Sequence, residues 1–397
     1  MGRWLWAAAA SLSALALVQR SRPTSAALSA LAAATAAAVA LLLGRKPKQA
    51  GLGAFVRYPR QYVARKATVE KIDGDLEKAV WQEAEWSCAF VEIRGPDAPP
   101  GTEPSPWQET KVKMLWDDEY LYIAAKMEVD AGNELVAKFK ERNSPIFHTD
   151  SDFEVFVDPA GCCHGYKELE MNALNTVWNL MLDRPYMDGG SEYSGRVAKE
   201  GEPKHWEVLR QKTAVKVTKG QIGNPTRPAQ WCCEVALAHA DTLGHAPRST
   251  QPFAGSCWRI NFSRVEKKGK VNWVWAPQVV WSPTDHRYVG QENMHLPDAW
   301  GYVVFADKPQ DTKEFQDPAW PARHAAACVY YACRAFKEAN GQFPEAWAEL
   351  LASNLLKGAE LFAAEVVYRR TEGYVAQVTA MGRTVQINHQ RLLTVVS

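Results

Sequence analysis

The chain has 397 residues, of which 47% are hydrophobic and 23% are charged, and its formal net charge at pH 7 is +1. This composition is typical of a folded globular protein and excludes disordered, collagen-like and coiled-coil chains. The charge is uneven, because ten basic residues precede the first acidic residue, Glu70. The rest of the chain is therefore acidic, which argues against nucleic acid as a partner, since phosphate binding needs a basic surface. Eight cysteines in so long a chain are too few for a disulfide scaffold.

Two apolar runs lie near the N-terminus, Trp4–Val18 and Ala26–Leu43. The second run has 18 residues without a charge, which is just long enough to span a bilayer. The runs fit a signal anchor, a cleaved signal peptide or an organelle transit segment. We favour an anchor or a secretory signal, which predicts a membrane-anchored or secreted protein with possible membrane attachment; import into a plastid or another organelle is the alternative. Residues 1–67 are therefore assigned to this segment and a linker.

From Thr68 onward, short alternating runs are separated by turn residues, which is typical of half-buried strands. Thr110–Trp116 and Tyr120–Val129 flank an acidic turn and predict a β-hairpin. Further strands are predicted at Asp152–Asp158, Tyr166–Leu174, Thr213–Thr218, Trp231–Leu237, Trp258–Arg264, Trp273–Trp275 and Tyr302–Phe305. We therefore predict a mainly β fold, an antiparallel β-sandwich of jelly-roll or immunoglobulin-like type, over residues 68–308.

Two long loops, Gly95–Pro106 and Gly189–His205, interrupt this region, and loops on a rigid sheet often carry binding function. A second unit follows the sandwich. The spacing of apolar residues predicts an amphipathic helix over Trp320–Asn340 and a shorter helix within Pro344–Ser353. Alternating segments then continue to the C-terminus, so residues 318–397 are predicted to form a small α+β unit.

Acidic residues gather on two of the predicted strands. If Asp152–Asp158 pairs with Tyr166–Leu174 through the loop Pro159–Gly165, one face of the sheet carries several carboxylates. These residues are Asp152, Glu154, Glu168 and Glu170. Like charges so close together repel each other, so something must compensate for them.

Two kinds of compensation are open. The carboxylates can be solvent-exposed and paired with arginines, for which Arg259 and Arg264 on a later strand are candidates. Alternatively, Ca²⁺ can bind there, because this ion prefers carboxylate and carbonyl oxygens. Asp150 and Asp152 are the candidate metal ligands.

Tryptophan is abundant, with 16 residues in the chain. An aromatic ring can stack on the apolar C–H face of a sugar while nearby amides and carboxylates bind its hydroxyls. Trp178, Trp275 and Trp300 lie near predicted strand ends and are the stacking candidates, with core packing as the alternative. Trp81 and Trp116 are assigned to the core from their place in the alternation.

Signals of catalysis are weak. The vicinal pairs Cys162-Cys163 and Cys232-Cys233 lack the spacing of a zinc site. Glu154 and Glu168 can be drawn as the acid/base pair of a glycoside-acting enzyme, but such a pair needs a defined gap across a cleft. No residue is therefore predicted to be catalytic.

Seven segments in order form a recognisable series. They are Ile72–Trp81, Val112–Ile123, Asp150–Asp158, Tyr166–Trp178, Trp258–Arg264, Asn272–Pro277 and His295–Tyr302. In this series the chain resembles the carbohydrate-binding module family 9-like proteins, which are relatives of the DOMON sandwich domains. The resemblance implies a β-sandwich that binds a saccharide or polysaccharide without catalysis, often beside glycan-degrading enzymes.

The sugar-binding members of this family hold a terminal sugar between two tryptophans. Where the first would stand this chain has Phe147 and His148, and near the second it has Met294 and His295. Phe147 can still stack on a sugar. An extra stretch, Val279–Gln291, precedes His295 and is expected to reshape that edge.

The resemblance also places Glu154 and Asn172 at polar positions near the family's ligand. The full set of predicted ligand-binding residues is Phe147, His148, Glu154, Glu168, Glu170, Asn172, Trp178, Arg264, His295 and Trp300. Because DOMON relatives include cytochromes, a haem-binding redox domain with Met294 and His295 as axial ligands is an alternative function. A glycoside-acting enzyme is another.

Overall fold

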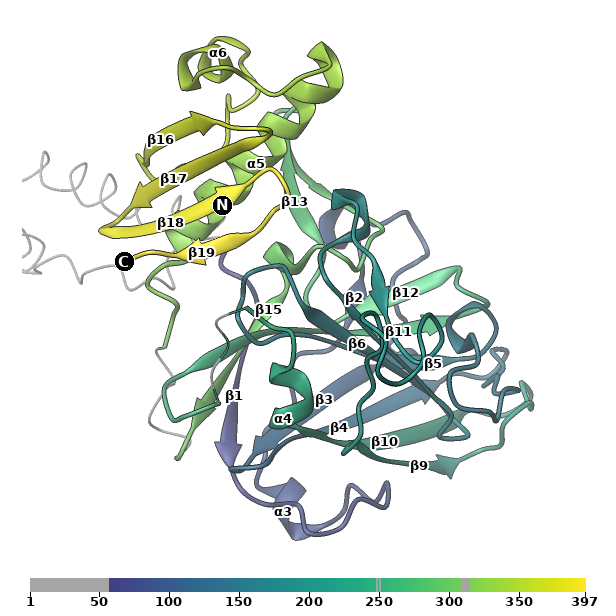
Figure 1. Cartoon of the computed structure of the whole chain (residues 1–397). Helices are drawn as coiled ribbons and strands as arrows, with labels where there is room; N and C mark the ends of the chain where they lie inside the picture. Colours follow the sequence, from purple (N-terminus) through teal and green to yellow (C-terminus); the bar gives the residue numbers. More distant parts are fainter. Residues whose placement is uncertain (1–56, 248, 250, 309–314) are drawn as a thin grey trace, which may run out of the picture. The chain divides into compact units, whose positions relative to one another are not determined.

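The computed structural model describes residues 57–247, 249, 251–308 and 315–397, and these form one compact unit. Within these residues, no helix combines the length and the apolar character needed to cross a bilayer. The apolar runs near the N-terminus lie outside the described residues. Strands dominate the fold (Figure 1), which confirms the predicted mainly β class.

The first layer of the sandwich contains the two strands that carry the acidic residues. Its strands, in spatial order, are β8 (Glu192–Tyr193), β7 (Val177–Leu182), β6 (Tyr166–Asn172), β5 (Asp152–Asp158), β11 (Cys257–Glu266) and β15 (Gly301–Ala306). All these neighbours pair antiparallel. Two shorter strands, β12 (Val271–Val274) and β2 (Val91–Glu92), extend from one end of β11.

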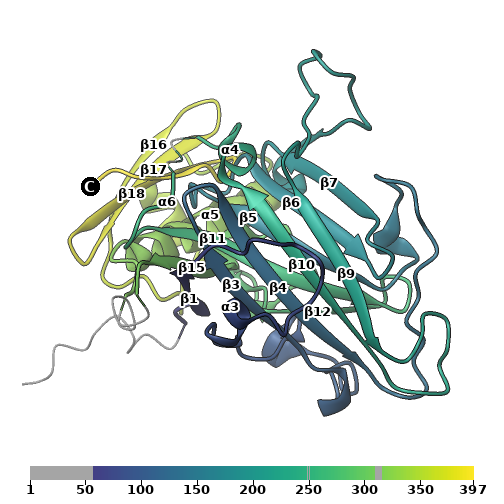
Figure 2. The same ribbon diagram turned by 90° about the horizontal axis from the view of Figure 1, so that it is seen from below.

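The second layer faces the first, and its strands lie side by side in Figure 2. Its strands are β3 (Thr110–Trp116), β4 (Tyr120–Val129), β10 (Ala229–Ala238) and β9 (Lys212–Lys219). The predicted hairpin is confirmed, because β3 and β4 pair antiparallel with Trp116 opposite Leu121. A short helix, α4 (His239–Leu243), follows β10.

One strand joins the two layers. β1 (Gln61–Lys66) pairs in parallel with β15 along its length and with β3 at its last two residues. It lies in the stretch that was predicted to be linker, so the sandwich begins before residue 68. Its alternation, with only Tyr62 and Ala64 buried, is too short to stand out from the basic residues around it.

The main core lies between the two layers. Alternate residues of β5, Phe153, Val155 and Val157, point into it and meet apolar side chains from β4 and β10. Trp116 belongs to this core, whereas Trp81 is buried in a separate cluster on the outer face of the second layer. Both tryptophans therefore pack in the interior, as predicted.

A single buried carboxylate fixes the segment that contains Trp81 to the second layer. Glu234 on β10 is wholly buried, and its carboxylate accepts hydrogen bonds from the backbone amides of Asp73 (2.8 Å) and Gly74 (3.0 Å). It also accepts from the Trp81 indole Nε1 at 2.7 Å and from the Lys78 ammonium at 2.7 Å. The Ile72–Trp81 motif, which ends in the short helix α3 (Ala79–Gln82), is thus held by one side chain.

The C-terminal unit is an antiparallel sheet with one long helix against it (Figure 1). The helices are α5 (Trp320–Asn340) and α6 (Trp347–Ala352). The strands, in spatial order, are β16 (Glu365–Arg370), β17 (Tyr374–Ala380), β18 (Arg383–Asn388) and β19 (Leu393–Val395). The bounds of α5 agree with the prediction, and Gly341 ends the helix in the left-handed conformation.

The extra stretch before His295 connects the two parts. It forms the hairpin β13 (Val279–Ser282) and β14 (Arg287–Gly290), which packs against α5. Trp281 joins the core of the C-terminal unit, and its indole Nε1 donates to the Leu355 carbonyl at 3.0 Å. Tyr288 makes a 2.7 Å hydrogen bond to the His324 ring on α5. The insertion thus docks the C-terminal unit onto the sandwich.

Candidate functional site

A pocket of about 590 Å³ opens on the outer face of the first layer, opposite the main core. Its floor comes from the central strands of that layer, and its principal floor residues are Glu154, Phe156, Glu168, Glu170 and Trp178. Its rim comes from the loops around them, and the principal rim residues are Phe147, Tyr186, Glu192, Glu292, Met294 and His295. Six of the ten predicted ligand-binding residues line this one pocket: Phe147, Glu154, Glu168, Glu170, Trp178 and His295.

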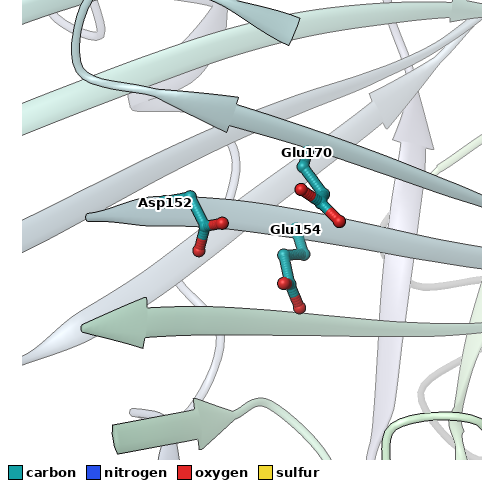
Figure 3. A group of neighbouring side chains, drawn as sticks. All are labelled: Asp152, Glu154 and Glu170. Atoms are coloured by element: carbon teal, nitrogen blue, oxygen red, sulfur yellow. The ribbon is translucent and has the colours of Figure 1, made fainter. Parts of the chain in front are cut away.

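Strand register brings the acidic residues together. β5 and β6 pair through the loop Pro159–Gly165, as predicted, with Glu154 directly opposite Glu170. Trp178 on β7 lies opposite Glu170, on the side of β6 away from β5. Ser263 on β11 lies opposite Glu154, on the side of β5 away from β6. These four residues therefore form a row across the floor. Figure 3 shows Asp152 beside this row, on the same strand as Glu154.

The acidic face is buried, which contradicts the prediction of solvent exposure. Asp152 is wholly buried, and Glu154, Glu168 and Glu170 are nearly so. Burial raises the pKa of Glu154 to about 7 and that of Glu168 to about 8, and the nearby Glu154 charge adds to the effect at Glu168. Burial and the repulsion of neighbouring carboxylates likewise raise the pKa of Asp152 and of Glu170.

The arginines that were predicted to compensate this charge lie elsewhere. Arg259 stands opposite Asp158 and donates to the backbone carbonyls of Asp298 and Trp300. Arg264 occupies the other face of β11, where it pairs with Glu266 at 2.7 Å. Its position follows from strand alternation, since residue 263 faces the pocket side.

A loop supplies a different arginine at the pocket. Arg196, in the long loop Gly189–His205, pairs with Glu192, and its charge offsets part of the rise in the pKa of Glu168. Its guanidinium carbon lies 3.5 Å from the centroid of the Trp178 ring, so it covers one face of that indole. Phe147 meets the same indole edge-on, with ring centroids 5.1 Å apart.

The most exposed aromatic ring at the rim is Tyr186, which is 47% exposed and meets the His295 ring edge-on at 4.7 Å. The His295 ring Nδ1 and the Tyr166 hydroxyl lie 3.0 Å apart and share a hydrogen bond whose direction depends on the histidine tautomer. Burial lowers the pKa of His295 to about 4, so the ring is neutral near pH 7. Met294 lines the pocket beside His295, and its carbonyl accepts a hydrogen bond from the Trp300 indole.

Several predicted residues instead hold the walls of the site. Asp150 accepts hydrogen bonds from the amides of Lys138 and Phe139 and from the Asn172 amide group at 2.7 Å. These bonds use three of the roughly four acceptor positions of the Asp150 carboxylate, which therefore braces this wall. Asn172 completes the brace by accepting from the amides of the turn that follows it.

The remaining predicted aromatic residues lie in the interior. Trp300 is wholly buried beneath the pocket, where it packs against Phe156 and Tyr166. Trp275 belongs to the main core. The backbone of His148 lies in the short turn Ile146–His148 beside the pocket residue Phe147, and its side chain is outside the described part of the structure.

Reasoning from the sequence missed Tyr186, Glu192 and Arg196, which all come from the segment after β7. The only sequence signal for them is the long loop and a tyrosine between Pro185 and the glycine pair that follows.

The C-terminal unit fixes the turn that carries Tyr186. The carboxylate of Asp188, two residues later, forms an ion pair with Arg391 at 3.1 Å and accepts a hydrogen bond from the Tyr330 hydroxyl. Arg334 on α5 donates to the Met187 carbonyl at 2.7 Å. Side chains of the C-terminal unit thereby determine the position of one rim aromatic.

Part of the chain is similar to a known protein family. Residues 72–192 match the family model described as carbohydrate family 9 binding domain-like. This range contains the whole acidic floor together with Trp178 and Tyr186, whereas His295 lies beyond it. No curated protein matches the chain.

Solved structures of similar chains come from two bacteria. A protein of Bacteroides uniformis ATCC 8492, to which carbohydrate binding is provisionally assigned, is 14% identical; the match covers 62% of this chain and 99% of that one, with a TM-score of 0.43. A family 9 carbohydrate-binding module of Caldicellulosiruptor kristjanssonii in complex with cellotriose is 14% identical, with coverages of 65% and 100% and a TM-score of 0.36. The same module in complex with glucose is 15% identical; the match covers 64% of this chain and 100% of that one, with a TM-score of 0.37. Over residues 72–192, the chain is therefore similar to the carbohydrate family 9 binding domain-like family.

Proposed function

We propose that this domain binds saccharides, without converting them, in the pocket on the outer face of β5 and β6. One observation carries the proposal: within the segment that matches the family, the fold brings partly exposed aromatic rings and carboxylates into one hollow. The volume of about 590 Å³ lies within the range of ordinary small-molecule sites, roughly 300–1,000 Å³.

The pocket offers the two kinds of contact that a sugar needs. Tyr186 and the Trp178–Phe147 pair present apolar ring surface, while Glu154 and Glu168 offer oxygens to sugar hydroxyls. The affinity should be modest, because each sugar hydroxyl exchanges a hydrogen bond with water for one with protein at small net gain. The acidic lining also disfavours uronic acids and sulfated sugars, since their charge would be repelled at short range.

Titration of the full chain with a glycan panel tests the function. The panel should contain neutral, amino and acidic saccharides, with glucose and cellotriose among the neutral ones. We expect binding by at least one neutral or amino saccharide and none by uronic acids, measured by isothermal titration calorimetry. If no saccharide in the panel binds, the proposed function is wrong.

A tryptophan substitution tests the site. Trp178→Ala removes the indole that Phe147 and Arg196 pack against, and should weaken saccharide binding by roughly tenfold or more, since an aromatic contact in a site is worth about 1–2 kcal/mol. Trp107→Ala is the matched control, because Trp107 is 75% exposed and does not line the pocket. Equal affinities for the two variants in the same titration would move the site away from this pocket.

The location of the protein is part of the same proposal. The apolar runs at the N-terminus support a membrane-anchored or secreted protein, in which the sandwich meets glycans outside the membrane. Attachment would then be through the apolar runs Trp4–Val18 and Ala26–Leu43.

A further inference from the structure

The floor of the pocket contains a cluster of three carboxylates. Asp152, Glu154 and Glu170 each place one oxygen so that the three oxygens lie within 4.8 Å of one another. In Figure 3 Asp152 and Glu154 come from β5 and Glu170 from the neighbouring strand. Acidic residues on a sheet are common, so the spacing alone does not indicate a ligand.

A second observation concerns the satisfaction of these groups. Asp152 is wholly buried, yet among the described residues neither of its carboxylate oxygens meets a hydrogen-bond donor in good geometry. Glu170, also buried, leaves its Oε2 without a partner. A buried ionised carboxylate without a partner is strongly unfavourable, and native proteins rarely contain one. An ionised Asp152 therefore requires a partner that the described residues do not provide.

The described part of the chain supplies no compensating cation at this point. Across residues 57–247, 249, 251–308 and 315–397, no lysine or arginine forms an ion pair with the three carboxylates. Arg196 pairs with Glu192 and Arg264 pairs with Glu266.

We infer that Asp152, Glu154 and Glu170 bind one hard divalent cation of the Ca²⁺ class at the floor of the pocket. Three carboxylates offer up to six oxygens. This number suits Ca²⁺, which takes about 6–8 oxygen ligands, water among them, and accepts irregular geometry. No nitrogen or sulfur ligand belongs to the cluster, which disfavours zinc and copper. Glu154 and Glu170 line the pocket, so an ion can enter from solvent on that side.

The metal site predicted from the sequence consists of Asp150 and Asp152. In this cluster Glu154 and Glu170 take the place of Asp150, and Asp152 is retained. Asp150 is occupied by hydrogen bonds, and Asp152 instead turns toward two glutamates. Cation binding goes beyond the proposed saccharide function, although it shares Glu154 and the pocket floor with it, and it is measured separately. The two can therefore fail separately.

Calorimetric titration of the chelator-treated full chain with CaCl₂ tests the inference. We expect one Ca²⁺ per chain and a rise in the midpoint of thermal unfolding when Ca²⁺ is added, since a ligand that binds only the folded state stabilises it. Absence of Ca²⁺ binding by the wild-type chain would overturn the inference, whatever the glycan titration shows. Saccharide binding that persists in the chelator would leave the proposed function standing.

Charge-removing variants assign the ion to this cluster. Asp152→Asn and Glu170→Gln keep the side-chain shape but remove a ligand charge, and each should weaken Ca²⁺ binding by roughly 100-fold. In the chelator, both variants should unfold at a higher temperature than the wild type, because they relieve repulsion between buried carboxylates. Glu372→Gln, an exposed residue of the C-terminal unit, is the control and should bind Ca²⁺ as the wild type does. Unchanged Ca²⁺ affinity in both cluster variants would overturn the assignment.

Discussion

Glu234→Ala is expected to lower the free energy of unfolding by about 3–5 kcal/mol, as is usual when one partner of a buried charged network is removed. The buried carboxylate is the common acceptor for the backbone amides of Asp73 and Gly74, the Trp81 indole and the Lys78 ammonium. Its loss leaves buried donors without a partner and opens a cavity beside Trp81. Urea-induced unfolding followed by tryptophan fluorescence measures the change.

Two further variants separate the causes of this effect. Glu234→Gln keeps the volume but places an amide N–H among donors, so it should recover only part of the lost stability. Glu365→Ala, an exposed glutamate on β16, should change the free energy of unfolding by less than about 0.5 kcal/mol. A loss below about 1 kcal/mol for Glu234→Ala would show that the Ile72–Trp81 segment is held by something other than this carboxylate.

Strand alternation explains why much of the sandwich is predictable. In β5 the apolar side chains Phe153, Val155 and Val157 alternate with acidic ones, and only one register places the apolar set in the core. The same pairing puts Glu154 opposite Glu170, so the acidic floor follows from local pattern alone. The bounds of β3, β4, β5 and α5 agree with the predictions for the same reason.

Elements without a clear period escaped prediction. β7 is apolar at most positions and largely buried, so its alternation is masked. The hairpin of β13 and β14 acquires its partner only when α5 packs against it. Both depend on contacts between residues distant in the chain, which local pattern does not contain.

Burial of the acidic floor is likewise a tertiary property. A strand face with alternating charge is normally exposed, but here loops carrying Phe147, Tyr186 and His295 enclose it. The sequence places these loops but does not show which face of the sheet they cover. For that reason the pocket residues on β5 and β6 are predictable, whereas Tyr186 and Arg196 are not.

Arg391→Leu is expected to impair both stability and saccharide binding. The buried guanidinium pairs with Asp188 at 3.1 Å and with Asp298 at 3.0 Å, and it donates to the Tyr330 hydroxyl at 3.1 Å. Leucine leaves the Asp298 carboxylate without its cation and leaves Asp188 paired only with Arg334 at 3.4 Å, which should lower the free energy of unfolding by about 3–5 kcal/mol. The turn that carries Tyr186 also loses one of its fixed points.

Arg391→Leu should weaken saccharide binding because the turn that carries Tyr186 becomes less firmly fixed. A Tyr186 side chain that must be ordered on binding costs about 0.5–1.5 kcal/mol, which weakens saccharide binding by roughly 2- to 10-fold. Calorimetric titration at a temperature where the variant remains folded measures this. Arg391→Lys retains the positive charge but lacks the planar guanidinium that contacts two carboxylates at once. It should therefore recover part of the stability but little of the saccharide affinity that depends on the position of the Tyr186 turn.

A comparison of two destabilised variants distinguishes positioning of the turn from general loss of stability. Glu234 lies on β10 in the second layer, so Glu234→Ala should lose similar stability yet keep the wild-type saccharide affinity while folded. Arg383→Leu, an exposed arginine on β18, should change neither property. If Arg391→Leu and Glu234→Ala bind saccharide equally well, the C-terminal unit stabilises the fold without shaping the pocket. If only Arg391→Leu binds more weakly, the unit acts on the rim through Asp188, since that carboxylate joins Arg391 to the turn bearing Tyr186.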